Sequence, residues 1–140
     1  MLALRLLFTA VLVGMLGIIG WASSHTALFD IPREVFTHPW FIATLFDAYL
    51  AFVAFWVWLA WKEGTVAARV LWLLTILLWG NPAIAGYMLL ELARVRREGG
   101  GLDAVFTRKR PGHLAVPATL FVLAVAAYVI GAKNILFPAS

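Results

Sequence analysis

The stretch WFIATLFDAYLAFVAFWVWLAW, residues 40–61, decides the fold class of this chain. Its only charged side chain is that of Asp47, and it meets the length of roughly 20 apolar residues that a helix needs to cross a bilayer. Pro39 precedes it, and proline suits the first turn of a helix because its missing N–H would be unpaired there anyway. Lys62 and Glu63 end the run. We therefore expect a transmembrane helix over residues 40–61.

The composition of the whole chain agrees with this interpretation. The sequence is 64% hydrophobic and 13% charged, with a mean hydropathy of +0.93, whereas a soluble domain is about half apolar and about a quarter charged. The first apolar run is longer than the roughly 7–15 residues of a signal-peptide core, so we interpret it as a retained helix. We expect an all-α, polytopic integral membrane protein, a four-helix transmembrane bundle in a single domain over residues 1–140. The helices are expected at about 2–23, 40–61, 66–93 and 114–132.

The distribution of lysine and arginine predicts the orientation of these helices. Basic residues cluster in the hydrophilic loop 94–112, and Arg33 adds to them on the same side of a four-span protein. Basic loops stay in the cytoplasm, so both termini are expected outside, although Arg5 and the free amino group favour the reverse. We expect the cytoplasmic (inner) membrane of a bacterium, with membrane lipids as partners. The net charge of +4 then suits anionic headgroups, and we expect no nucleic acid.

Asp47 is the first candidate for a functional site, because ionisable groups inside a membrane are costly. At 1.5 Å per residue it lies about 10 Å into the second helix, on a face with Thr44 and several alanines. One interpretation is a carboxylate that binds a proton or a ligand. The other is a helix-packing hydrogen bond to Asn81, Tyr87 or a backbone group. In both cases Asp47 is expected to face the bundle interior and to bond to the third helix.

The tripeptide Gly80-Asn81-Pro82 interrupts the third helix midway. Proline removes a backbone N–H and crowds the carbonyl four residues earlier, which predicts a bend near residues 78–82. Asn81 is expected to point into the bundle, since a carboxamide in hydrocarbon needs partners. The bend is most simply structural, although broken helices also line the binding sites of many transporters.

Glu91 lies four residues after Tyr87, on the same face of the third helix. If the second and third helices are antiparallel spans, Asp47 and Glu91 share a leaflet and could act as an acid and a base. The more common role for Glu91 is an interfacial ion pair with Arg94 or Arg96.

No cofactor motif is evident in the chain. It contains no cysteine, which excludes disulfides, thiolate metal sites, iron–sulfur clusters and covalent c-type haem. The three histidines fall at helix ends and their spacing matches no ligand signature, so neither a metal nor a haem is expected at His25, His38 or His113.

The stretch HPWFIATLFDAY, residues 38–49, and its continuation WLAWKE, residues 58–63, resemble a family signature. The family is an uncharacterised one, a domain of unknown function, of small four-helix membrane proteins of plants and bacteria. In it a Pro-Trp pair is followed by Ala-Thr-Leu, an aspartate and a tyrosine, and an apolar span then ends in Lys-Glu. The resemblance imports no activity. It implies that the family's motif singles out Thr44, Asp47, Tyr49, Lys62 and Glu63.

Three functions fit these observations. The first is a non-catalytic subunit or scaffold of a membrane complex, associated with other subunits or with itself, whose ligand could be a lipid or a pigment. The second is an oligomeric proton-coupled transporter of a small molecule, with Asp47 as the coupling carboxylate. The third is a membrane enzyme acting on a lipid-like substrate, and catalysis is the less expected outcome. The ligand or proton site would comprise Asp47, Thr44, Tyr49, Asn81, Tyr87 and Glu91.

Overall fold

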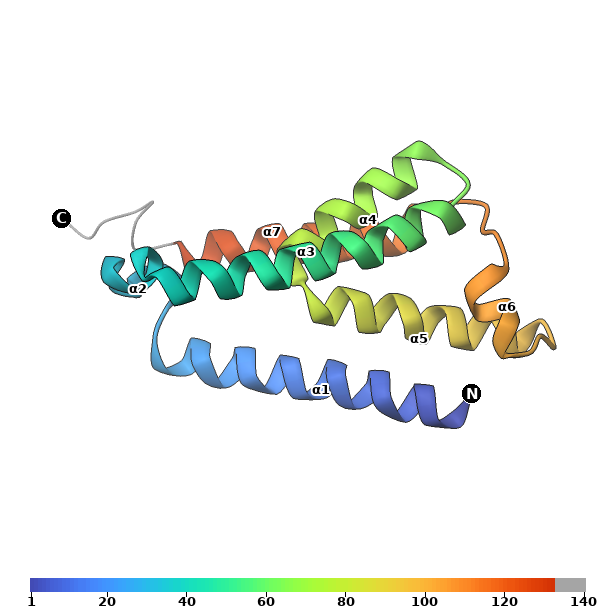
Figure 1. The fold of residues 1–140 in the computed structure, drawn as a ribbon, viewed down its shortest axis with the longest axis horizontal. Helices are drawn as coiled ribbons and strands as arrows, with labels where there is room; N and C mark the ends of the chain where they lie inside the picture. The colour runs from blue at the N-terminus through green and yellow to red at the C-terminus, as the bar shows by residue number, and fades with distance from the viewer. Residues whose placement is uncertain (133–140) are drawn as a thin grey trace.

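The computed structural model describes residues 1–132 and is all-α (Figure 1). Residues 133–140 lie outside the described range. Helices α1, α3 and α7 cover the first, second and fourth ranges expected from the sequence, and the other elements lie between them in the chain. In chain order the elements are α1 (Leu2–His25), the 3-10 turn η1 (Leu28–Asp30), α2 (Arg33–Thr37), α3 (Pro39–Lys62), α4 (Val66–Trp79), α5 (Asn81–Arg97), α6 (Leu102–Thr107) and α7 (Ala115–Gly131).

Helices α1 and α3 are long and apolar enough to cross a membrane, judged by length and composition. Each has 24 residues, or about 36 Å at 1.5 Å per residue, against a hydrocarbon core of about 30 Å. Much of their apolar surface is not covered by the rest of the described residues. No residue of α1 is buried, and in α3 only Leu59 and Lys62 are.

The range 66–93, expected as one bent helix, is two helices separated at Gly80. Gly80 has φ +61° and ψ −129°, a conformation that only glycine adopts readily. A Cβ there would lie 2.8 Å from Cζ of Phe52. The carbonyl of Gly80 accepts the N–H groups of Ala83 and Ile84 at 3.1 and 3.2 Å. The chain is therefore interrupted where the sequence predicts, but the interruption is a complete break.

Helix α5 turns back toward the end of the molecule from which α4 starts (Figure 1). Trp72 and Tyr87 lie at nearly equal sequence distances from Gly80, and their ring centroids are 5.0 Å apart. Glu91 then reaches Lys62, the last residue of α3, at 2.5 Å. Helices α4 and α5 thus form a hairpin whose apex, Gly80, lies beside Phe52 near the middle of α3.

This hairpin changes the expected arrangement of the chain's ends. Tyr128 of α7 packs against Phe29 of η1, with ring centroids 6.5 Å apart, whereas Arg5 donates to the carbonyl of Leu92 at 3.1 Å. Met1 and Gly131 accordingly lie at opposite ends of the molecule (Figure 1). The prediction of both termini on one side counted residues 66–93 as a single crossing, whereas in the structure these residues form a hairpin that returns to the end where it starts.

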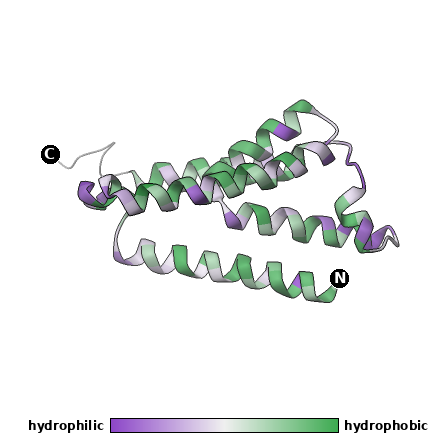
Figure 2. Cartoon of the chain, in the orientation of Figure 1, coloured by the Kyte–Doolittle hydropathy of each residue, from purple (hydrophilic) through white to green (hydrophobic). Residues whose placement is uncertain are grey.

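The core surrounds the second half of the hairpin. Tyr87, Leu92 and Val95 of α5 are fully buried, and α1 packs along α5. Hydropathy follows this arrangement, with apolar residues along the helices and hydrophilic ones gathered toward the two ends (Figure 2). Within the described residues, the other buried apolar members of this cluster are Leu59, Trp72, Ile76, Ala83, Met88, Ala104 and Val105.

Candidate functional site

Charged side chains converge on Glu91 at the end of the molecule where α3 and α5 finish. Glu91 has no exposed surface, and a buried carboxylate is tolerated only when it is paired and hydrogen-bonded. Its Oε2 lies 2.5 Å from Nζ of Lys62. Both of its oxygens accept from Nε of Arg110 at 2.9 Å, and Oε1 also accepts from Nη1 of Arg94 at 3.1 Å. One carboxylate therefore ties together α3, α5 and the segment after α6.

Lys62 is itself fully buried, which is rare for lysine unless it is paired. Besides Glu91, its ammonium group donates to the carbonyl of Val105 in α6. It also lies 5.0 Å from the ring centroid of Trp58, within the range of a cation–π contact. The carbonyl of Lys62 accepts the N–H of Arg110 at 2.9 Å. Lys62 therefore joins the end of α3 to α5, to α6 and to residue 110.

Arg110 extends this network toward the surface. Its Nη1 lies 2.9 Å from Oε1 of Glu98, and Arg108 pairs with the other oxygen of Glu98. Hydrogen bonds from Arg108 and Arg110 lower the pKa of the Glu98 carboxyl. Arg110 lies close to the backbone after α3, and this approach requires glycine at position 64, where a Cβ would lie 2.7 Å from the carbonyl oxygen of Arg110.

Glu63 has a different environment from Glu91. It is 2% exposed, and its Oε1 accepts a hydrogen bond from the hydroxyl of Tyr87 at 3.1 Å. No lysine or arginine of residues 1–132 lies within salt-bridge distance of its carboxyl group, although Arg69 donates to its backbone carbonyl at 2.9 Å. Burial raises the pKa of Glu63, and the hydrogen bond from Tyr87 opposes that shift.

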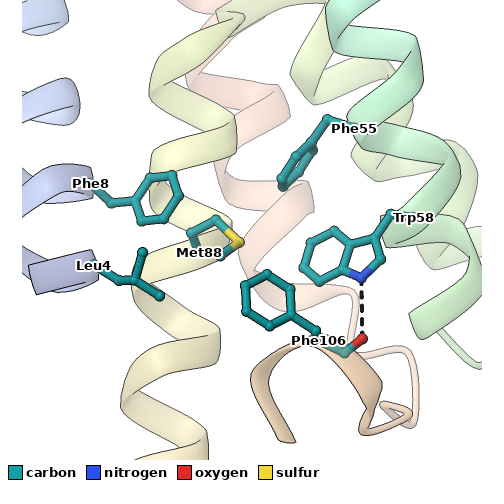
Figure 3. Close-up of a pocket in the computed structure, with 6 residues that line it drawn as sticks. All are labelled: Leu4, Phe8, Phe55, Trp58, Met88 and Phe106. Carbon is teal, nitrogen blue, oxygen red and sulfur yellow. Dashed lines mark hydrogen bonds between the residues drawn. The ribbon is translucent and has the colours of Figure 1, made fainter. Parts of the chain in front are cut away.

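An apolar groove adjoins this charged end (Figure 3). It lies among α1, α3, α5 and α6 and has a volume of about 270 Å³. Trp58 belongs to both features, because its ring lines the groove and also contacts Lys62. Its indole N–H donates to the carbonyl of Phe106 at 3.2 Å, which fixes the ring against α6. The lining side chains are Leu4, Phe8, Phe55, Trp58, Met88 and Phe106.

The structure brings together part of the set expected from sequence and leaves the rest outside. Tyr87 and Glu91 join Lys62 and Glu63, the Lys-Glu pair that ends the apolar run, at the charged end. The expected ion pair of Glu91 with Arg94 is present. Arg110 was not singled out from the sequence, because its place in the network depends on a long loop folding back. Its positive charge was its only distinguishing feature.

Asp47 does not face the bundle interior. Its side chain is exposed, and no hydrogen bond to it occurs among residues 1–132. The expected bond to Asn81 or Tyr87 is therefore wrong. The hairpin contacts α3 at Phe52 and at the hydroxyl of Tyr49, and it leaves the Asp47 side chain exposed.

The remaining candidates also lie away from the charged end. Thr44 is exposed, and its hydroxyl donates to the carbonyl of Trp40 at 2.8 Å. Tyr49 donates to the carbonyl of Leu77 at 3.3 Å. Asn81 is exposed, so the expectation that it points into the bundle is wrong. The carbonyl of Gly80 caps the start of α5 in its place.

Asp47 and Glu91 do not lie side by side. Glu91 contacts Lys62, and Lys62 lies about 22 Å along α3 from Asp47 at 1.5 Å per residue. An acid–base pair of these two residues within one chain is therefore ruled out by the reversal of α5. No group of three His, Asp or Glu side chains within the described range is placed to hold a metal ion, and His25 instead contacts the carbonyl of Trp21 at 2.8 Å.

The model of a family described as a protein of unknown function (DUF1475) matches residues 2–132. The chain belongs to this family. The DUF1475 match includes both the charged end and the groove, so the two features lie inside the family's domain. The expectation of an uncharacterised family is confirmed, while its occurrence in plants and bacteria and its signature stay predictions. Comparison with curated proteins and with solved structures gives no match.

Proposed function

We propose that this DUF1475 protein is an integral membrane protein without catalytic activity, a subunit or scaffold that holds an anionic lipid. The groove among α1, α3, α5 and α6 takes an acyl chain, and the basic end beside it takes the headgroup. The observation that carries this proposal is the direct contact between the two features at Trp58, which lines the groove and packs on Lys62.

Exposure of the two long helices supports membrane insertion. The core helix of a soluble protein is mostly buried. By contrast, no residue of α1 is buried, and Leu59 and Lys62 are the buried residues of α3. Soluble monomers rarely expose contiguous apolar patches beyond a few hundred Å². Here large apolar side chains such as Leu6, Val13, Phe46 and Leu50 are each more than 60% exposed. Lipid chains are the surroundings that suit such a surface.

The basic residues support one orientation of the molecule. Among residues 1–132, every lysine and arginine except Arg33 lies at the end that carries Met1, Glu91 and Arg110. The positive-inside rule places this end in the cytoplasm, where anionic lipids attract basic residues. Loop 94–112 is then cytoplasmic, as the sequence predicts, and so is Met1. The membrane would be the cytoplasmic membrane of a bacterium.

The mouth of the groove has the chemistry of a lipid headgroup site. Arg5 follows the lining residue Leu4 and reaches across to α5, where it donates to the carbonyl of Leu92. The Arg94 side chain is 30% exposed, and Arg96 and Arg97 are exposed on the last turn of α5. A phosphate at the surface would therefore meet several guanidinium groups, which suit the geometry of phosphate oxygens.

The two alternative functions gain no specific support. A proton-coupled transporter would use Asp47, and an enzyme would pair Asp47 with Glu91. Asp47 lies about 22 Å along α3 from Lys62, the residue that contacts Glu91, and Glu91 is already bonded to three cations.

A bulky side chain placed in the groove tests the proposal. Leu4→Trp fills it, whereas Leu6→Trp adds the same ring at a position that is 64% exposed and outside the groove. Native mass spectrometry of protein released from nanodiscs of equal phosphatidylglycerol and phosphatidylcholine gives the bound lipid. We expect retained phosphatidylglycerol in the native protein and in Leu6→Trp, and its loss in Leu4→Trp.

The headgroup is tested separately with Arg96→Gln/Arg97→Gln, which leaves the groove intact. This variant should retain lipid but lose the preference for phosphatidylglycerol. Equal lipid retention by Leu4→Trp and Leu6→Trp would refute the binding of an acyl chain in the groove. An unchanged preference for phosphatidylglycerol in the double variant would refute the headgroup site.

A further inference from the structure

Within residues 1–132, the guanidinium group of Arg110 has an unpaired donor. Its Nε donates to both oxygens of Glu91, and its Nη1 donates to Oε1 of Glu98. Its Nη2 is buried and has no hydrogen-bond partner in this part of the chain. A buried donor without an acceptor is costly, and such atoms are rare in folded proteins. The Nη2 atom therefore points to an acceptor that the described residues do not supply.

Two arginines converge on Glu98, beside this donor. Nη1 of Arg110 lies 2.9 Å from Oε1 of Glu98, and Arg108 pairs with the other oxygen. The Glu98 side chain is 40% exposed, whereas that of Arg110 is 7% exposed, so Glu98 is the surface end of the network. Nη1 and Nη2 of a guanidinium group form a planar fork of donors. The carboxylate of Glu98 uses only the Nη1 half of that fork.

The charges at this end favour an anion as the partner of Nη2. Its salt bridges within the described residues join four cations to two carboxylates, and counting Glu63 as an anion still leaves the cations in excess. A water molecule supplies an oxygen but no charge. A phosphate group has several oxygens, so it can bind a guanidinium fork through two bonds and face a second arginine as well. The cations are Lys62, Arg94, Arg108 and Arg110, and the carboxylates are those of Glu91 and Glu98.

We propose that Arg110 and Arg108 form a binding site for a phosphate group, and that Glu98 is an internal competitor for it. The phosphate oxygens take the place of the Glu98 carboxylate and also accept from Nη2 of Arg110. The phosphate belongs either to a free anion or to a lipid headgroup. The inference does not rest on the proposed groove, because neither arginine lines it.

Glu98→Gln tests the competition. The amide carries no charge and competes less for the two arginines, so a phosphate group should bind about tenfold more tightly, which corresponds to about 1.4 kcal/mol. Asp103→Asn is the matched control. It also removes one negative charge, but Asp103 is exposed and forms no salt bridge within the described residues, so the affinity should stay that of the native protein.

The first probe is inorganic phosphate, added to the protein in detergent and compared with chloride at equal ionic strength. A ligand of the folded state raises the temperature of unfolding, which tryptophan fluorescence follows. The second probe is phosphatidylglycerol, retained from nanodiscs and measured by native mass spectrometry. A gain of Glu98→Gln over Asp103→Asn with inorganic phosphate supports a site for a free anion. A gain in lipid retention alone supports a site for the headgroup.

No gain of Glu98→Gln over Asp103→Asn with either probe overturns the proposal. Arg110→Lys gives a second test, because it keeps a positive charge beside Glu91 but lacks the fork. A folded Arg110→Lys protein should bind the effective probe at least about tenfold more weakly than the native protein, and undiminished binding also overturns the proposal. If Arg110→Lys does not fold, the comparison of Glu98→Gln with Asp103→Asn decides alone.

Failure of this inference is distinguishable from failure of the proposed function. If Leu4→Trp and Leu6→Trp retain lipid equally while Glu98→Gln gains affinity for inorganic phosphate, only the groove is refuted. If Leu4→Trp loses lipid and Glu98→Gln gains nothing with either probe, only the phosphate site is refuted.

Discussion

Glu91 and Glu63 lie at the same end of the molecule, yet their side chains have different partners. Glu91 is bonded to Lys62, Arg94 and Arg110, so its negative charge holds the end together. Glu63 has a tyrosine hydroxyl as its hydrogen-bond donor and no cation within salt-bridge distance in the described chain. Replacing each carboxyl group by its amide should therefore change the stability of the protein differently.

Glu91→Gln should be strongly destabilising. The amide leaves Lys62 buried without its counter-charge and Arg110 with Glu98 alone, and breaking a buried ion pair in this way costs about 3–5 kcal/mol. Unfolding in mixed detergent micelles, followed by circular dichroism, measures the loss. Asp103→Asn is the matched control, because Asp103 is exposed on α6, and it should change stability by less than about 0.5 kcal/mol. Equal stability of the two variants would show that the network does not hold the fold.

Glu63→Gln should be tolerated at neutral pH. Burial raises the pKa of Glu63 above its ordinary value of 4.5, so the folded protein binds this proton more tightly than the unfolded chain. The stability of the native protein therefore falls as the pH rises from 4.5 through the raised pKa. The glutamine side chain of the variant cannot titrate, and its amide oxygen can still accept from Tyr87.

The measurement is the unfolding free energy of both proteins across this pH range. The native protein should lose stability relative to Glu63→Gln as the pH rises. A native protein that gains stability relative to the variant over the same range would show that Glu63 is instead stabilised as an anion.

At the residue scale the sequence predicted part of this site. The Lys-Glu pair at the end of the apolar run, together with Tyr87 and Glu91, was singled out and these residues do meet. The sequence also predicts that Asp47 meets them, because an uninterrupted helix over residues 66–93, antiparallel to α3, would lie beside it. Which face of α3 is covered depends on how far the hairpin reaches, and that length is set by tertiary contacts.

At the scale of elements, Gly80 determines that α4 and α5 are two helices. Gly80→Ala should destabilise the hairpin, because the new Cβ meets Phe52 at 2.8 Å and φ of +61° with ψ of −129° disfavours any side chain. Backbone strain of this kind costs about 1–3 kcal/mol. Gly86→Ala is the control, since Gly86 lies within α5 and a Cβ there meets nothing within 4 Å. It should be neutral or stabilising by up to about 1 kcal/mol.

Unfolding in detergent compares these two glycine variants directly. A Gly80→Ala protein as stable as Gly86→Ala would show that the break is not held by the backbone of Gly80. The sequence predicted the position of the break from Gly80-Asn81-Pro82, but not the reversal. A proline kink is compatible with a helix that continues across the membrane, and the contacts of Tyr87 with Trp72 and of Glu91 with Lys62 show that α5 returns.

At the scale of the whole molecule, the hairpin determines at which end of the molecule each segment lies. If residues 66–97 crossed the membrane once, the two ends of that segment would face opposite sides. In the structure both ends meet at the charged end, where Glu63 and Arg110 form a backbone bridge. Hydropathy alone could not distinguish these cases, because a re-entrant hairpin is as apolar as a span. The orientation of Met1 relative to the membrane depends on this difference.

Cysteine accessibility tests this arrangement most directly, since the chain has no cysteine of its own. Val66→Cys and Arg97→Cys mark the two ends of the hairpin, and Val35→Cys marks the opposite end of the molecule; all three positions are exposed. In intact cells a membrane-impermeant maleimide should label Val35→Cys alone, and permeabilisation should expose both hairpin positions. Labelling of Val66→Cys and Arg97→Cys from opposite sides of the membrane would contradict the re-entrant hairpin and restore four spans.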